Sequence, residues 1–154
     1  MDHQRLDHEA VLRLVNGNME ALEWIQIGRR YVHEGDDLID VDIAGGSKIA
    51  AATRACRLGA LALELYTHPF FIKNMPALKY AMLRNLHNYR DSVLLENSKV
   101  PWQKQFSDWA RHGWLDVCQT VGDLCAGFDN TCNETLEMRA LAYADHHSEN
   151  GEQV

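Results

Sequence analysis

Hydrophobic residues recur every three or four positions along most of the chain, a spacing that predicts amphipathic α-helices. No segment alternates between apolar and polar residues as a half-buried strand would. The hydrophobic spacing and the residues that start or stop helices divide the chain into six helical segments. These segments cover about residues 7–16, 19–41, 48–65, 76–96, 101–126 and 133–147. We therefore expect an all-α fold, a compact bundle of five or six helices.

Local signals set some of the helix boundaries. Ser47 is a good N-cap for the third helix, and Pro76 suits the first position of the fourth. Between these two helices, Thr67-His68-Pro69-Phe70-Phe71 breaks the helical pattern. No repeat or linker divides the chain, so we expect a single helical domain over residues 1–147 and a polar tail over residues 148–154.

The charge and hydropathy of the chain argue against a nucleic-acid-binding protein and against a membrane-spanning one. The chain has 154 residues, with 22 Asp and Glu against 15 Lys and Arg, and its formal charge is −7. This balance argues against binding to nucleic-acid backbones, which needs clusters of Lys and Arg. No apolar run is long enough to cross a membrane, and residues 1–5 lack the apolar core of a signal peptide. We therefore expect a cytoplasmic protein with no membrane partner.

The residues with the clearest chemical potential lie in one acidic stretch of the second helix. Five carboxylates fall within residues 34–42, next to His33. Because like charges this close repel one another, the helix gains little from them without a cation or a basic partner. On a helical wheel, Asp36, Asp40 and His33 lie at the edge of the apolar arc, and Asp37 points further towards water. This segment is the best candidate for a functional site.

The fourth helix offers groups that complement this acidic segment. Arg90 falls inside its apolar arc, and His87 and Asp91 fall at the border of that arc. A buried arginine without a partner is costly. We therefore expect Arg90 to form an ion pair with Asp36 or Asp40.

Together these residues suggest metal-dependent phosphate chemistry. Carboxylates one turn apart on a helix can share Mg²⁺ or Mn²⁺, and these ions hold phosphate oxygens. The predicted metal ligands are Asp36, Asp37, Asp40 and Asp91. Arg90 is predicted to bind a phosphate oxygen, and His33, His87 or His112 to act as the acid or base. A metal-bound water would attack a phosphorylated small molecule, with nucleotides among the candidate substrates.

Other interpretations of the polar residues stay open. The acidic segment is also typical of a solvated helix end near Arg29, Arg30 and Lys48, or of a structural salt-bridge network around Arg90. In the fifth helix, three acidic or imidazole side chains share one face, which we interpret as solvated unless another helix or subunit covers it. These are His112, Asp116 and Asp123. The four cysteines are predicted to be buried small apolar residues.

Two acidic patterns resemble known enzyme motifs. Asp36-Asp37-Leu38-Ile39-Asp40 has the form of the aspartate-rich motif of isoprenoid synthases, but their second acidic motif is missing and we reject that function. Glu20 and Glu23, followed by Asp37 and Asp40, are similar to the E-x-x-E … E-x-x-D pattern of all-α nucleoside triphosphate pyrophosphatases. That resemblance implies four acids that bind Mg²⁺ for nucleotide hydrolysis, although Asp37 stands where that family has Glu.

The chain as a whole resembles small uncharacterised helical proteins of bacteriophages and prophages. The blocks that carry the resemblance are Tyr31-Val32-His33, Asp36-Asp37-Leu38-Ile39-Asp40, Tyr66-Thr67-His68-Pro69-Phe70-Phe71, Asn88-Tyr89-Arg90-Asp91-Ser92-Val93 and Asp145-His146-His147. The resemblance implies a helical fold and a phage origin, hence the host cytoplasm, but no reaction. It adds His68 to the candidate residues and also includes Asp91, since both lie in these blocks.

A non-enzymatic function is the alternative hypothesis. A phage protein of this kind would be a virion component or a host-directed inhibitor whose acidic surface binds a basic host protein. The tryptophans that could anchor such a partner are Trp24, Trp102, Trp109 and Trp114. Self-association into a homo-oligomer also fits, because Trp109 lies on the exposed polar side of the fifth helix.

Overall fold

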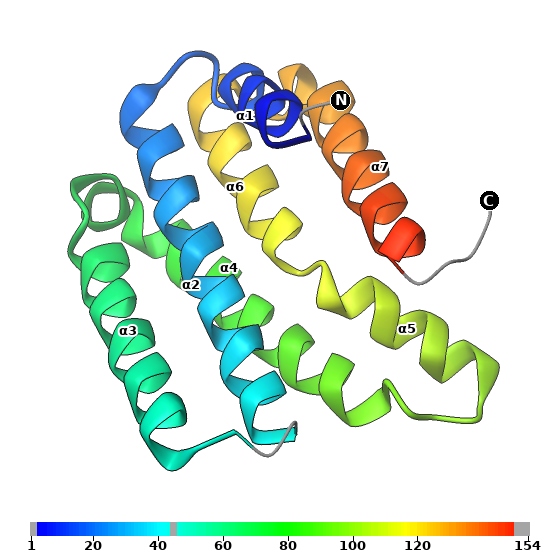
Figure 1. Ribbon diagram of the computed structural model, residues 1–154. Coiled ribbons are helices and arrows are strands. Elements are labelled where there is room, and N and C mark those ends of the chain that lie inside the picture. The colour runs from blue at the N-terminus through cyan, green and yellow to red at the C-terminus, as the bar shows by residue number, and fades with distance from the viewer. Residues whose placement is uncertain (1–2, 44–45, 150–154) are drawn as a thin grey trace. The chain divides into compact units, whose positions relative to one another are not determined.

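The computed structural model describes residues 3–43 and 46–149, and the side chains of residues 8–40 and 46–140. Within these residues the chain forms seven α-helices, one 3-10 turn and no strand (Figure 1). The elements are α1 (His3–Leu14), α2 (Met19–Ile43), α3 (Lys48–Thr67), α4 (Pro69–Leu95), α5 (Pro101–Arg111), α6 (Trp114–Ala126), η1 (Phe128–Asn130) and α7 (Cys132–Glu149). The all-α prediction is confirmed, but the expected count of five or six helices is too low.

The additional helix arises because the predicted fifth helix is interrupted at Gly113. α5 ends at Arg111 and α6 begins at Trp114. The backbone of Gly113 lies close to α4, since a Cβ built on it would be 3.0 Å from Asn85 Oδ1 and 3.1 Å from Asn88 Cβ. This contact is between segments distant in sequence, so hydrophobic spacing alone did not predict the interruption.

The fourth helix begins earlier than Pro76, where the sequence pattern placed its start. α4 starts at Pro69, which occupies a first helical position that a proline tolerates well. Pro76 instead lies inside the helix, two residues after Asn74, whose backbone is non-helical (φ −112°, ψ 16°). Because proline removes a backbone donor and crowds the preceding turn, a kink at this point is expected. The Asn74 side chain donates a hydrogen bond of 2.9 Å to the Phe70 carbonyl.

The chain divides into two compact units, which we describe separately. Unit 1 comprises Met1–Met19 and Pro76–Val154, and unit 2 comprises Glu20–Met75. The expected single domain over residues 1–147 stays a prediction. No helix in the described ranges is both long enough and apolar enough for a membrane span.

In unit 1, α1, α6 and α7 pack against one another around an apolar core. Its most deeply buried side chains include Leu14, Val15, Leu78, Met82, Val117, Cys118 and Val121. Helices α1 and α6 approach closely at Gly122, where a Cβ would lie only 2.6 Å from Leu14 Cδ1. An ion pair of 2.7 Å between Arg13 and Glu137 joins α1 to α7 at the surface.

In unit 2, α2 and α3 form an antiparallel hairpin (Figure 1). Ser47 caps α3 as predicted, with its hydroxyl accepting a 3.1 Å hydrogen bond from the Ala50 backbone N–H. Trp24 is fully buried, and its indole N–H donates a 3.0 Å hydrogen bond to the Leu65 carbonyl. Its ring lies about 6 Å from those of Phe70 and Phe71. This aromatic cluster fixes α2, α3 and the start of α4 together.

The cysteines follow the prediction only in part. Cys118 is buried and Cys125 is partly buried, whereas Cys56 and Cys132 are exposed. The prediction of four buried cysteines was therefore wrong for Cys56 and Cys132. Cys118, Cys125 and Cys132 recur every seven residues, a spacing typical of one face of a continuous helix. The spacing does not place Cys132 on the buried face, because α6 ends before this residue and α7 begins at it.

Candidate functional site

The acidic segment lies in the C-terminal half of α2, and a basic residue of α3 partly neutralises it. Arg54 Nη1 lies 2.7 Å from Asp37 Oδ2 and 3.5 Å from Glu34 Oε1. The side chain of Glu34 is only 16% exposed, whereas that of Asp37 is largely open to solvent. One guanidinium group thus offsets the repulsion between two carboxylates that lie one helical turn apart.

The connection between α2 and α3 explains why these residues meet. α2 ends at Ile43 and α3 begins at Lys48, and helices joined by so few residues run antiparallel as neighbours. Positions at equal distance from the connection therefore face each other. This register places Asp37 opposite Arg54 and Glu34 opposite Arg57.

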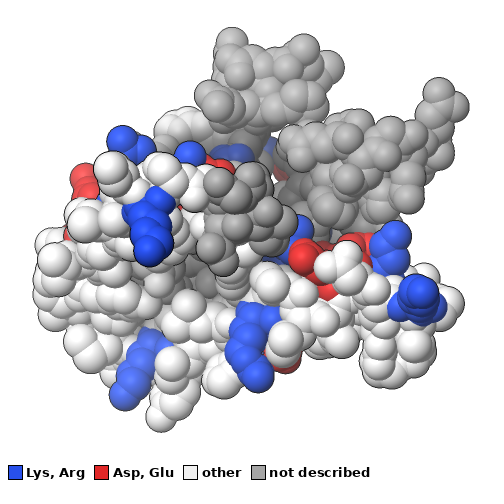
Figure 2. Space-filling view, turned by 60° about the horizontal axis from the view of Figure 1, so that its bottom comes forward, with Lys and Arg blue, Asp and Glu red and all other residues white. Residues whose placement is uncertain are grey.

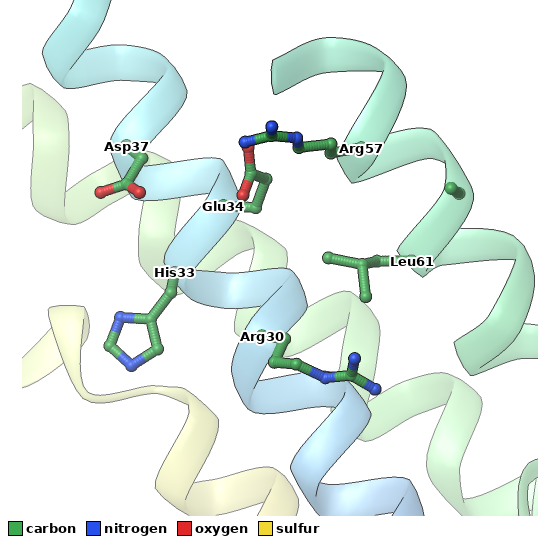
Figure 3. Close-up of a pocket in the computed structure, with 7 residues that line it drawn as sticks. Arg30, His33, Glu34, Asp37, Arg57 and Leu61 are labelled. Atoms are coloured by element: carbon green, nitrogen blue, oxygen red, sulfur yellow. The ribbon is translucent and has the colours of Figure 1, made fainter. Parts of the chain in front are cut away.

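A groove of about 450 Å³ runs between these two helices. It is lined by Arg30, His33, Glu34 and Asp37 of α2 and by Arg57, Ala60 and Leu61 of α3. Figure 3 shows Arg30 and Glu34 pointing towards α3, and Arg57 and Leu61 pointing towards α2. The groove therefore combines two guanidinium groups, two carboxylates and a short apolar wall.

Arg57 and Arg30 differ in how they are paired. Arg30 lies 3.5 Å from Glu64 at the surface. Arg57 is exposed, and no hydrogen bond or ion pair engages it within the residues that the structure describes. An exposed, unpaired guanidinium beside an apolar wall is suited to bind a planar or tetrahedral oxyanion.

The structure brings only some of the predicted site residues to this groove. Asp37 and His33 line it, but Figure 3 shows the imidazole of His33 pointing away from α3. Asp40 is exposed, and Asp36 is half-buried. Among the described side chains, no group of three or more His, Cys, Asp or Glu is arranged to hold a metal ion.

The remaining predicted residues belong to unit 1. Arg90 is 71% exposed and lies 3.6 Å from the neighbouring Asp91, and His87 is exposed as well. Arg90 therefore does not have the buried position that its place on the helical wheel suggested. Its expected ion pair with Asp36 or Asp40 would join the two units and stays a prediction.

The acidic face of the predicted fifth helix has structural partners. Asp116 forms an ion pair of 2.5 Å with Arg139 of α7, and Asp123 accepts a 2.6 Å hydrogen bond from the Thr131 hydroxyl. Both acids are half-buried. Of the two interpretations left open for this face, the covered one applies to Asp116 and Asp123, because Arg139 of α7 and Thr131 contact them.

His68 also has a structural role. Its imidazole Nδ1 accepts a 3.3 Å hydrogen bond from the backbone N–H of Phe70, in the first turn of α4. Its Nε2 lies 3.6 Å from Glu23 Oε2, and the side chain is only 10% exposed. A histidine held between a helix start and a carboxylate in this way positions α4 against α2.

Arg54 and Arg57, which face the acidic segment, were not among the predicted site residues. Their signal was available, because they lie one turn apart on α3 and a short connection precedes that helix. On the face drawn in Figure 2, the described Lys and Arg side chains lie mostly apart, separated by uncharged surface.

Comparison of the chain with protein-family models, with curated proteins and with solved structures gives no match.

Proposed function

We propose that unit 2 binds a phosphorylated small molecule in the groove between α2 and α3. The observation that carries this proposal is the pair of guanidinium groups, Arg30 and Arg57, that reach one groove from facing helices. The planar fork of arginine matches the spacing of phosphate oxygens and forms charge-assisted hydrogen bonds with them. The apolar wall of Ala60 and Leu61 offers a surface for an uncharged part of the ligand.

A divalent ion fits this groove as a companion of the ligand. Mg²⁺ is commonly held by one or two protein carboxylates together with substrate phosphates, and it retains several waters. Glu34 and Asp37 supply two carboxylates at the groove. Arg54 already pairs with both, so an ion without phosphate must compete with a guanidinium group. We therefore expect Mg²⁺ or Mn²⁺ to bind mainly together with the phosphorylated molecule.

Binding is supported more directly than hydrolysis. His33, predicted as an acid or base, points away from α3, and the described lining of the groove holds no second histidine. Metal-assisted hydrolysis, with Asp36 and Asp40 as further ligands, stays part of the proposal. Asp36 precedes Asp37 on α2, and Asp40 follows Asp37 by three residues, close to one helical turn. Contributions from His87, Arg90 and Asp91 depend on how the two units meet.

Calorimetry tests this proposal. Metal-stripped protein is titrated with ATP, pyrophosphate and inorganic phosphate, each with and without Mg²⁺ or Mn²⁺. We expect saturable binding of at least one phosphorylated compound, strengthened by the metal. Arg57→Gln should weaken it about 10- to 100-fold, because charge-assisted hydrogen bonds contribute roughly 1.5–3 kcal/mol.

Lys73→Gln is the matched control, since it removes one exposed positive charge from unit 2 at a position outside the groove. Its affinity should equal that of the unaltered protein. Equal weakening in both variants would indicate a general effect of charge and would contradict the proposal, as would the absence of binding for every compound. Phosphate release, measured on the same samples, tests hydrolysis separately.

A further inference from the structure

A hollow in unit 1 is lined by residues of α4, α5 and α6. Its volume is about 310 Å³, at the lower end of the range for pockets that hold small molecules. The polar side chains that line it are Arg84 of α4 and Asp116, Gln119, Thr120 and Asp123 of α6, and Trp109 of α5 adds an indole ring. All of these residues belong to unit 1, so the hollow does not depend on how the two units meet.

Two features of unit 1 bring these residues together. On α6, Asp116, Thr120 and Asp123 are spaced by four and three residues, so their side chains share one face of the helix. The backbone of Gly113, which directly precedes α6, packs closely against α4. This contact places the first turn of α6 beside the part of α4 that carries Arg84.

The unpaired charges of the hollow have opposite signs and come from different helices. Arg84 is exposed, and none of the described residues forms a hydrogen bond or an ion pair with it. Asp123 is half-buried and accepts a 2.6 Å hydrogen bond from the neutral Thr131 hydroxyl, but no described cation pairs with it. Asp116, by contrast, already pairs with Arg139. A ligand that carries both a negative and a positive group would complete both unpaired charges.

The neighbouring groups of α6 favour a hydrogen-bond donor as the positive group. The Thr120 hydroxyl donates a 2.9 Å hydrogen bond to the Asp116 carbonyl, so its oxygen is left to accept one from a ligand. The carboxylate of Asp123 is likewise an acceptor. A primary ammonium group carries three N–H donors, whereas a quaternary ammonium group carries none. The primary ammonium therefore matches this wall of the hollow better.

We propose that the hollow binds a free α-amino acid with an apolar or aromatic side chain. Asp123 and Thr120 hold its ammonium group, and the planar fork of Arg84 holds its carboxylate. Trp109, which is 50% exposed, provides the apolar surface on which the side chain of the ligand lies. The hollow shares no lining residue with the groove between α2 and α3, so this proposal stands independently of phosphate binding.

NMR titration of the isotope-labelled full chain tests the proposal with three related compounds. L-phenylalanine carries both charges, L-phenylalanine amide lacks the carboxylate, and N-acetyl-L-phenylalanine lacks the ammonium group. We expect L-phenylalanine, added to about 20 mM, to shift saturably the indole N–H signal that is missing in Trp109→Phe. The two derivatives should bind about three- to tenfold more weakly, because each loses one charge-assisted contact at a partly exposed site.

Substitution of each unpaired charge should remove one part of this discrimination. Arg84→Gln should lower the affinity for L-phenylalanine to that for its amide, and Asp123→Asn should lower it to that for the N-acetyl derivative. Asn keeps an oxygen that accepts the hydrogen bond from Thr131, and thermal melts check that each variant is folded. Lys79→Gln and Asp129→Asn are the matched controls, because they remove the same charges at exposed positions of unit 1 outside the hollow. Both should leave the affinity unchanged.

Three results would overturn the proposal. The first is the absence of a saturable shift at Trp109 with L-phenylalanine. The second is binding of either derivative as tightly as L-phenylalanine, since the hollow would then recognise only one charge. The third is equal weakening by Arg84→Gln and Lys79→Gln, or by Asp123→Asn and Asp129→Asn, which would indicate a general effect of net charge.

Discussion

Arg54 of α3 forms an ion pair with Asp37 of α2, with 2.7 Å between Nη1 and Oδ2. The same guanidinium group lies 3.5 Å from the mostly buried Glu34. Five carboxylates within residues 34–42 repel one another, and the guanidinium group of Arg54, which belongs to the same unit, offsets part of this repulsion. It also means that any metal ion at Asp37 competes with Arg54.

Replacing Arg54 by Ala should lower the free energy of unfolding by about 1–2 kcal/mol. The loss exceeds that of an ordinary surface pair because the mostly buried carboxyl group of Glu34 would lose the guanidinium group that lies 3.5 Å from it. Urea denaturation at low salt measures it. Arg57→Ala, at an unpaired position on the same helix, should change stability by no more than about 0.5 kcal/mol. An equal loss in both variants would show that the ion pair does not stabilise the hairpin.

The same substitution should strengthen the binding of Mg²⁺ or Mn²⁺ in the absence of phosphate. Removal of Arg54 frees the carboxylates of Asp37 and Glu34 for a cation. Calorimetric titration of each metal into Arg54→Ala and into the unaltered protein compares the two, with Lys73→Ala as the control for lost positive charge. No gain over the control would mean that these carboxylates do not take part in metal binding.

Gly122 of α6 should be intolerant of a side chain. A Cβ at this position would lie 2.6 Å from Leu14 Cδ1 and 3.1 Å from Thr131 Cγ2, within a packed core. Gly122→Ala should therefore destabilise the protein by about 1–3 kcal/mol. Gly59→Ala in α3 is the control, because nothing lies within 4 Å of its Cβ position. There the gain in helix propensity should stabilise by about 0.5–1 kcal/mol. A thermal melt in which both variants shift in the same direction would contradict this account.

Burial raises the pKa of Tyr66 above its ordinary value of 10.0, with a smaller contribution from Tyr31. The folded state therefore holds this proton more tightly than the unfolded state does. The resulting stability is fully present below pH 10 and is lost as pH rises from there through the folded-state pKa.

The difference in unfolding free energy between the unaltered protein and Tyr66→Phe should thus be constant from about pH 8 to pH 9.5 and should fall above pH 10. Urea denaturation across this range provides the measurement. A flat difference for Tyr66→Phe would contradict the assigned effect of burial.

Local sequence signals predicted the helices well where the decisive interactions are local. The hydroxyl of Ser47 caps α3 through a residue three positions away, so its role is visible in the sequence. The break at Gly113 depends instead on Asn85 and Asn88, far away along the chain. Of the three prolines that could start a helix, Pro69 and Pro101 do so, whereas Pro76 lies after a kink inside α4. The presence of a proline does not by itself show whether a helix starts there or is kinked there.

The site was predictable only in its acidic half. The carboxylates of α2 are conspicuous in the sequence, but their basic partner depends on which helix packs beside them. Arg90 was the expected partner of Asp36 or Asp40 because it falls on an apolar arc, and that pairing stays a prediction. The basic partner that the structure shows is Arg54, which pairs with Asp37. The short connection before α3 already implied that pairing, since residues 37 and 54 lie at similar distances from it.

The most direct test of the central claim locates the ligand on the protein. Amide and arginine side-chain NMR resonances are recorded with ATP and a small fraction of Mn²⁺, whose unpaired electrons broaden nearby signals. We expect the broadening to centre on Arg57, Glu34 and Asp37 in the groove between α2 and α3, and Arg57→Gln to reduce it greatly. Broadening centred elsewhere on the chain, or unchanged in Arg57→Gln, would contradict that claim.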